Sequence, residues 1–196
     1  MRGSYKKKTK DKIMSAAWEL FQEYGYEETT ISQIIEKSGT SRSAFYHHFH
    51  GKEELLFTAA YTYDHDYDIW LKEYYDKELH TVDNLISFNT FVMRAVEESP
   101  FQSFYPSLYG LQVMTEGVRH ILNPDRRYYQ IIRQLLKEGS EAGEIASVHS
   151  YPVLADMITS FQIGITYSWC LQQGHYSLQQ YGQELLNPFL ESLRAV

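Results

Sequence analysis

The residues best suited to bind another molecule lie in a short predicted helix around residue 45. At helical spacing its polar side chains share one side, and they are Arg42, Ser43, Tyr46, His47 and His50. The other side holds Ala44, Phe45, His48 and Phe49. Arginine can donate two hydrogen bonds to guanine, and hydroxyl groups can bond phosphate oxygens or base edges. The polar side therefore suits nucleic acid, although an amphipathic surface helix with an exposed histidine-rich side would show the same pattern.

A longer helix is predicted upstream, from Thr9 to Tyr24. Its apolar residues recur at intervals of three and four and form one stripe: Ile13, Ala16, Ala17, Leu20, Phe21 and Tyr24. Gly25 is expected to end this helix, because glycine adopts the left-handed conformation at little steric cost. The stripe predicts that the helix packs against the short helices that follow it.

Two short helices are predicted between this helix and residue 50. Thr30 and Gln33 have the spacing of a capping box that opens the first of them, and Gly39 is expected to end it. The second begins almost at once, with Ser41 as the expected N-cap. Two short helices joined by a glycine-containing turn and packed on a longer helix are the outline of a helix-turn-helix.

Charge is distributed unevenly along the chain, whose net charge is -7. Residues 1–52 contain nine Lys and Arg against six acidic residues, whereas the remainder contains nine against nineteen. This division favours a basic nucleic-acid-binding module attached to an acidic body, although a solvated lysine tail beside an acidic domain would also produce it. Lys6, Lys7, Lys8, Lys10 and Lys12 are expected to form a flexible arm that neutralises phosphate or enters a minor groove, or else a solubilising tail.

Several ordered motifs between Ile13 and Leu56 resemble the TetR family of transcriptional regulators. They are Ala17-x-x-Leu20-Phe21-x-x-x-Gly25-Tyr26, Thr29-Thr30-Ile31, Ile34 before Ser38-Gly39-Thr40-Ser41, and Phe45-Tyr46-His47-His48-Phe49 before Lys52-x-x-Leu55-Leu56. Two positions depart from the family pattern: Ile35 stands where alanine is common, and Ser43 where glycine is frequent. These departures leave the operator sequence open.

The resemblance implies a double-stranded DNA partner with a palindromic operator. It implies that the major groove and its flanking phosphates are faced by Thr40, Ser41, Arg42, Ser43, Tyr46 and His47. Thr30 and Lys52 would hold phosphates at the starts of the second and fourth helices, where helix dipoles favour anions. His48 is expected to have a mixed role, partly packed beneath its helix and able to bond a phosphate.

The rest of the chain also has helical periodicity, so the predicted fold class is all-α. A helix-turn-helix domain with a basic amino-terminal arm is expected over residues 1–52, and a helical ligand-binding and dimerisation domain over 53–196. Helices are expected over residues 52–79, 81–98, 101–120, 124–142, 152–173 and 177–195. Beyond residue 60 the resemblance to the family is architectural only.

The last two predicted helices carry more apolar surface than one chain needs. The helix from Pro152 to Gln173 is apolar on several sides, and the last helix has an apolar stripe from Leu185 to Leu193. The resemblance implies that these helices pair with a second copy as a four-helix bundle, which predicts a homodimer. The residues expected at that interface are Phe161, Ile165, Ser168, Leu186, Phe189 and Leu190.

Aromatic residues are numerous, with seventeen tyrosines and ten phenylalanines. The family carries an effector cavity among its middle helices, and a small apolar, aromatic or cationic effector is expected here. The residues expected to line the cavity are Tyr63, Tyr67, Trp70, Phe104, Tyr109, Met114, Phe161 and Tyr167. Ordinary core packing is the alternative for each of them.

Other classes of function receive little support. Asp64 and Asp68 are one helical turn apart, but an exposed acidic side explains them better than a metal site. The chain has no Ser/His/Asp elbow, P-loop or dinucleotide loop, so neither catalysis nor a cofactor is expected. With one cysteine, Cys170, and no apolar run of membrane-spanning or signal-peptide length, the protein is expected in the cytoplasm.

The leading hypothesis is a repressor that a small-molecule effector releases from its operator. An alternative is a DNA-organising or protein-partner factor with the same amino-terminal domain and no effector. A helical enzyme whose amino-terminal resemblance is accidental is a third. DNA binding through the clustered basic residues would exclude the third.

Overall fold

The computed structural model describes residues 2–114 and 120–195, and their side chains except those of residues 2–7, 59–63 and 65. Within these ranges the regular secondary structure is helical, apart from one isolated antiparallel bridge between Ile145 and Arg194. The predicted all-α class is confirmed. Two compact units are present: the first comprises Met1–Ala60 and Ser103–Thr115, and the second Tyr61–Gln102 and Glu116–Val196. The functional boundary expected after residue 52 stays a prediction.

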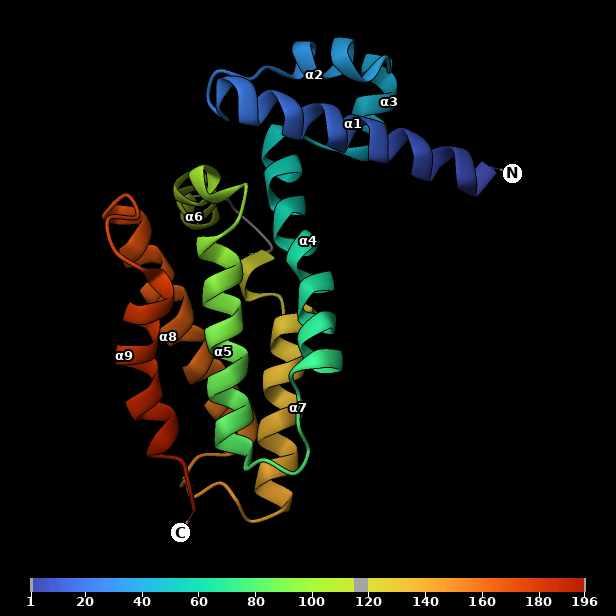
Figure 1. The fold of residues 1–196 in the computed structure, drawn as a ribbon. Coiled ribbons are helices and arrows are strands. Elements are labelled where there is room, and N and C mark those ends of the chain that lie inside the picture. Colours follow the sequence, from blue (N-terminus) through green and yellow to red (C-terminus); the bar gives the residue numbers. More distant parts are fainter. Residues whose placement is uncertain (1, 115–119, 196) are drawn as a thin grey trace. The chain divides into compact units, whose positions relative to one another are not determined.

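The first unit contains α1 (Arg2–Tyr24), α2 (Ile31–Ser38), α3 (Arg42–His48), the start of α4 (Lys52–Glu73) and α6 (Tyr105–Met114) (Figure 1). Helix α1 contacts both α2 and α3. It begins at Arg2 rather than at Thr9, so the lysine-rich segment expected as a flexible arm is helical. Lysine is a good helix former, which suits this extension.

The local signals of the helix-turn-helix act as the sequence predicts. The Thr30 hydroxyl accepts a hydrogen bond from the Gln33 backbone N–H at 3.3 Å, and Gln33 Oε1 accepts one from the Thr30 N–H at 2.7 Å. Gly39 ends α2 in the left-handed conformation, with φ of 61°. Ser41 then caps α3 by accepting from the Ala44 N–H at 3.1 Å. The predicted capping box and both predicted caps are confirmed.

The core of the first unit joins α1 to the short helices. Phe21 and Ile34 are buried, and so are Phe45, at the centre of α3, and Phe49, directly after it. The Phe104 ring lies 5.9 Å from the Phe21 ring, which connects the segment before α6 to α1. Burying large rings from α1 and α3 together fixes which side of α3 faces outward.

The second unit consists of the remainder of α4 with α5 (Thr81–Glu97), α7 (Arg127–Glu141), α8 (Tyr151–Leu171) and α9 (Leu178–Glu191). Helix α5 contacts α7 and α9, and α8 also contacts α7 and α9 (Figure 1).

Short 3-10 turns lie at η1 (Gln102–Phe104) and η2 (His120–Leu122). The single helix expected over 101–120 is therefore wrong at its start, where α6 follows η1 with Pro106 in its first turn.

An aromatic cluster fills the centre of the second unit. The Trp70 ring lies 4.8 Å from the Phe88 ring, which in turn stacks on the Tyr128 ring at 5.6 Å. Polar atoms at its edge are satisfied: Trp70 Nε1 donates to the Ser87 hydroxyl at 3.1 Å, and the Tyr128 hydroxyl donates to Asn89 Oδ1 at 3.1 Å. These bonds remove the cost of burying the polar ends of large rings.

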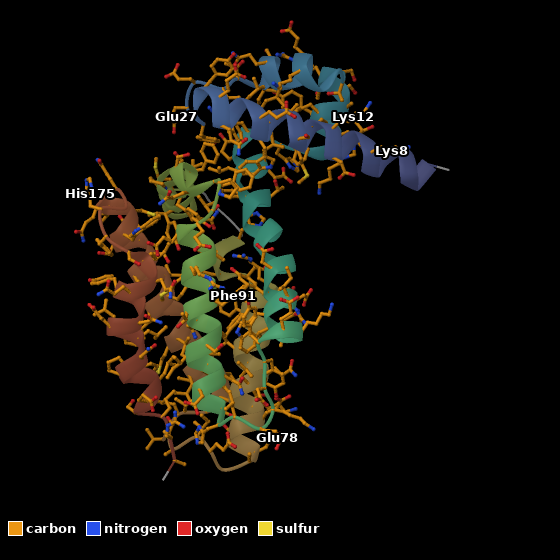
Figure 2. The ribbon with its side chains drawn as sticks, in the orientation of Figure 1. Lys8, Lys12, Glu27, Glu78, Phe91 and His175 are labelled. Carbon is orange, nitrogen blue, oxygen red and sulfur yellow. The ribbon has the colours of Figure 1, made fainter. Side chains whose placement is uncertain are left out.

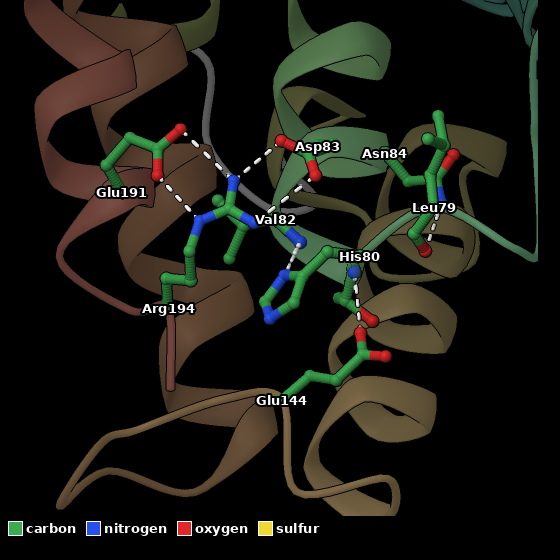
Figure 3. Close-up of polar contacts among 9 residues, drawn as sticks. Leu79, His80, Val82, Asp83, Asn84, Glu144, Glu191 and Arg194 are labelled. Atoms are coloured by element: carbon green, nitrogen blue, oxygen red, sulfur yellow. Dashed lines mark hydrogen bonds and ion pairs between the residues drawn. The ribbon is translucent and has the colours of Figure 1, made fainter. Parts of the chain in front are cut away.

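The chain end is held by a charged cluster on the second unit (Figure 3). Arg194 Nη2 donates to Asp83 Oδ1 at 2.6 Å and Nη1 donates to Asp83 Oδ2 at 3.2 Å, while Nε donates to Glu191 Oε2 at 2.8 Å. These hydrogen bonds lower the pKa of both the Asp83 and the Glu191 carboxyl groups. The guanidinium thereby joins the start of α5 to the end of α9.

None of the helices in the described ranges combines the length and apolar character needed to cross a lipid bilayer.

Candidate nucleic-acid interface and assembly surface

Helix α3 presents its polar side to solvent. Its aromatic anchors Phe45 and Phe49 are at most 1% exposed, whereas Tyr46 is 49% exposed. The exposed residues at and beside α3 are Ser41, Arg42, Ser43, Tyr46, His47 and His50. Because both anchors are buried, the outward side cannot rotate inward without exposing two large rings. The structure thus gives α3 a defined polar surface of donors and aromatic rings.

Polar groups at the start of α3 and in the turn before it already have partners within the first unit. Arg42 Nη2 lies 3.5 Å from the Ser32 hydroxyl, a long hydrogen bond that leaves most of the guanidinium donors for another molecule. The hydroxyls of Ser38 and Thr40 are 2.8 Å apart. These contacts fix the turn between α2 and α3 and keep Arg42 at its outer edge.

The histidines around the end of α3 differ from one another. His47 is exposed, whereas His48 is half-buried. His50 Nδ1 lies 3.0 Å from Glu54 Oε2, and the same carboxylate oxygen accepts the His50 backbone N–H at 2.8 Å. Glu54 therefore ties His50 to the start of α4, and His47 is the exposed histidine within α3 itself.

The Lys52 side chain has partners that are distant from it in the sequence. Its ammonium donates to the backbone carbonyl oxygens of Tyr26, Glu27 and Thr29 at 2.7, 3.0 and 3.0 Å. It also lies 4.4 Å from the centre of the Tyr26 ring. The expected phosphate contact of Lys52 stays a prediction, but its ammonium has three acceptors within the protein. Thr30, the other expected phosphate ligand, is exposed at the start of α2.

Basic side chains extend along the amino-terminal half of α1. Lys8 and Lys12 are exposed (Figure 2). Lys10 is exposed as well. The side chains of Lys6 and Lys7 lie outside the described residues. Lys10 lies 5.7 Å from the centre of the Phe49 ring, directly after α3. Helix α1 thus brings Lys10 close to the residue that directly follows α3.

A second surface feature is an apolar groove on α8 and α9 of the second unit. It encloses about 590 Å³ and is lined by Val153, Asp156, Met157, Ser160, Phe161, Gly164, Ile165, Ser168, Tyr181 and Leu185. Large apolar side chains are exposed in it: Phe161 at 41%, Val153 at 43% and Leu185 at 45%. An exposed apolar surface of this kind marks a site for another molecule.

The six residues expected at a dimer interface divide between this groove and the core. Phe161, Ile165 and Ser168 line the groove, and the Phe189 ring lies 4.9 Å from the Phe161 ring. Leu186 and Leu190 are at most 1% exposed, because they pack inside their own unit. The interface assignment stays a prediction.

The predicted set omits other residues of the groove. Val153, Met157 and Tyr181 line it without being in the expected interface set. Val153 and Met157 precede Phe161 at four-residue intervals, which is the sequence signal that could have identified them.

The residues expected to line an effector cavity are distributed over both units. Tyr67 and Trp70 belong to the aromatic cluster of the second unit. Phe104 and Tyr109 are buried in the first unit, where Met114 is 82% exposed. Phe161 and Tyr167 are about 40% exposed on α8. The Tyr63 side chain lies outside the described residues. The effector assignment stays a prediction for every member of the set.

The acidic run on α4 forms ion pairs. Arg127 Nε donates to Asp68 Oδ1 at 2.6 Å, and Arg126 Nη2 lies 3.4 Å from Asp64 Oδ1. Burial raises the pKa of Asp64, and Arg126 opposes that rise. No group of three metal-binding side chains occurs among the described residues.

Known proteins match both the amino-terminal motifs and the whole fold. The family of bacterial regulatory proteins named tetR matches residues 13–59. The transcriptional regulator QacR of Staphylococcus aureus is 25% identical, covering 91% of this chain and 96% of its own. The regulator SrpR of Pseudomonas putida is 26% identical, covering 79% of this chain and 69% of its own.

A solved structure shares the fold over nearly the full length. It is FadR of Thermus thermophilus, a TetR-family transcriptional repressor in complex with lauroyl-CoA, with a TM-score of 0.76. It is 17% identical and covers 95% of this chain and 96% of its own. The matched helix-turn-helix and the regulators that align along the chain agree: residues 13–59 match the tetR family of bacterial regulatory proteins, and the chain as a whole is similar to transcriptional regulators of that kind.

Proposed function

We propose that the protein is a dimeric repressor that binds a palindromic operator through α3 and is released from it by a small-molecule effector. The observation that carries the proposal is the outward polar side of α3, held in place by the buried rings of Phe45 and Phe49. A short exposed helix with arginine, hydroxyl and imidazole groups is suited to the donors and acceptors of a major groove.

The proposed contacts fall into two classes. Arg42 reads a base edge, with Ser43, Tyr46 and His47 beside it on the exposed surface. Thr30, Thr40 and Ser41 lie at the starts of α2 and α3, where hydroxyls and backbone amides bind phosphate. The phosphate contacts orient the helix, and the base contacts supply the sequence preference.

The proposed dimer buries the groove on α8 and α9 against a second copy. Its exposed apolar side chains support this assignment, because a lone chain would leave Phe161, Val153 and Leu185 in water. A two-fold interface places the same surface of both copies face to face. The same symmetry presents two copies of α3 to half-sites about 34 Å apart, which requires a palindromic site.

The proposed effector is a small apolar or aromatic molecule bound in the second part of the chain. The aromatic cluster around Trp70 and Phe88 supports this class, because a ligand that enters the cluster would meet apolar area and ring faces that attract cations, although both rings are buried without it. Such a ligand releases DNA only if it binds the non-binding conformation of the dimer more tightly than the DNA-binding one. Because its proposed partner is operator DNA, we place the protein in the cytoplasm.

Selection of bound duplexes from a randomised DNA library, with the purified full-length protein, tests this function. The expected result is an inverted repeat whose half-sites are separated by one turn of DNA. Uniform recovery of all sequences would contradict operator recognition and favour a DNA-organising factor. A screen of apolar and aromatic compounds against the selected duplex then tests release by an effector.

A further inference from the structure

Lys52, the first residue of α4, lies in a cage of backbone oxygens. The cage is made by the carbonyl groups of Tyr26, Glu27 and Thr29, all within 3.0 Å of Lys52 Nζ, and is closed by the Tyr26 ring. These groups belong to the turn of residues 25–30 between α1 and α2. A lysine ammonium has three N–H donors, so the cage accounts for all of them.

The cage is built on a turn that is itself well fixed. Gly25 has φ of 84°, and its carbonyl oxygen accepts a hydrogen bond from the Thr29 hydroxyl at 2.7 Å. Thr29 and Tyr26 are buried, at 1% and 5% exposed. Backbone carbonyls in such a turn do not take part in a helical ladder, and buried ones need a donor from elsewhere. Lys52 supplies that donor from a distance of more than twenty residues along the chain.

The position of the cage links it to DNA recognition. Thr29 directly precedes Thr30, the N-cap of α2, and α2 is joined to α3 by the Arg42–Ser32 and Ser38–Thr40 contacts. The Lys52 ammonium therefore connects the start of α4 to the segment that sets the direction of α2. We therefore expect a change in this connection to shift α2 and, through it, α3.

We propose that Lys52 is a positioning residue of the DNA-binding helices, whose ammonium holds the turn of residues 25–30 against the start of α4 and so orients α2 and α3 for the operator. This inference rests on the proposed operator binding and replaces the phosphate contact expected for Lys52. It assigns the side chain an action through the protein backbone rather than through DNA.

The salt dependence of operator binding distinguishes a positioning role of Lys52 from a phosphate contact. A lysine that neutralises one phosphate releases counterions, and its removal reduces the slope of log affinity against log salt by about 0.9. A positioning lysine leaves the slope unchanged when it is replaced. A Lys52→Arg variant distinguishes the same two roles in a second way. Arginine can bind a phosphate in place of lysine, whereas its planar fork cannot direct three donors at three converging carbonyls.

The test measures operator affinity of full-length Lys52→Met and Lys52→Arg proteins over a range of sodium chloride concentrations, with the selected operator duplex. We expect both variants to bind operator about tenfold more weakly, with wild-type salt slopes. A reduced slope in Lys52→Met that Lys52→Arg restores would overturn the proposal, as would wild-type affinity in Lys52→Arg. If circular dichroism shows Lys52→Met to be unfolded, the operator affinity and the salt slope of Lys52→Arg alone test the proposal.

Amide hydrogen exchange provides a readout that needs no DNA. In Lys52→Met, or in Lys52→Arg if the former is unfolded, the amides of residues 26–31 should exchange faster than in the wild type, while those of α9 stay unchanged. Unchanged exchange in residues 26–31 would contradict the cage. A wild-type protein without operator preference would contradict the proposed function, and this measurement would still decide whether Lys52 holds the turn.

Discussion

Gly139 of α7 and Thr81 of α5 meet so closely that no side chain fits between them. A Cβ atom on Gly139 would lie 2.6 Å from Thr81 Cγ2 and 2.7 Å from Thr81 Cβ. Both residues are buried, and Thr81 is the first residue of α5. Threonine is branched at Cβ and cannot move these atoms aside by changing a distal rotamer. The approach of α5 and α7 therefore depends on glycine at this position.

Replacing Gly139 by alanine should destabilise the protein by about 1–3 kcal/mol, because the added methyl forces the two helices apart. Unfolding in urea, followed by circular dichroism, measures the change. Gly110→Ala in α6 is the matched control: a Cβ atom at Gly110 would meet nothing within 4 Å, so that variant should be neutral or up to ~1 kcal/mol more stable. Equal effects of the two substitutions would refute the packing argument.

Arg42→Ala should lower the affinity for the selected operator by about 1–3 kcal/mol, because a base contact is lost, and leave affinity for random-sequence duplex much less affected. Lys8, which is exposed on α1, serves as the comparison. Lys8→Ala should weaken binding to both duplexes alike, as expected for a phosphate contact. Fluorescence anisotropy with both duplexes measures these differences, and equal losses for Arg42→Ala would show that Arg42 does not read a base.

Local signals were sufficient to predict the helix-turn-helix. The Thr30–Gln33 box, the glycine at position 39 and the Ser41 cap each act over three or four residues, and all are present. Lys52 marks the limit of such reasoning. Its acceptors precede it by 23 to 26 residues, and only the folded chain brings them to its ammonium.

The roles of the aromatic residues in the second part of the chain were less predictable, for a physical reason. An aromatic residue at helical spacing can fill a core, line a cavity or cover an interface, and composition does not distinguish these roles. Tyr67 and Trp70 proved to be buried within an aromatic cluster, whereas Phe161 is exposed in the groove. The α8 pattern predicted excess apolar surface, but which side remains exposed depends on how α8 packs on α7 and α9.

Acid should remove the stabilisation that Arg194 provides. Its hydrogen bonds lower the pKa of Asp83 and Glu191 in the folded state, so their contribution is present above their unfolded pKa values of about 4 and is lost as the pH falls through the lower folded values. Arg194→Gln should therefore be less stable than the wild type at pH 7, and the difference should shrink below about pH 4. Urea unfolding at both pH values tests this, and a constant difference would contradict the assigned coupling.

Phe161→Asp should convert the proposed dimer into a monomer. Phe161 is 41% exposed and lines the groove on α8 and α9, so the substitution disturbs little of its own core. In a two-fold dimer the new carboxylate would be desolvated near its own copy, and the groove already contains Asp156. Val148→Asp is the matched control, because Val148 is 98% exposed outside the groove.

Sedimentation equilibrium at micromolar concentration should give twice the chain mass of 23.0 kDa for the wild type and for Val148→Asp, and a single chain mass for Phe161→Asp. The monomeric variant should also lose affinity for the inverted repeat, because two linked copies of α3 bind two half-sites with a large gain in effective concentration. A wild-type protein that sediments as a monomer and still binds the inverted repeat tightly would refute both the interface and the repression mechanism that depends on it.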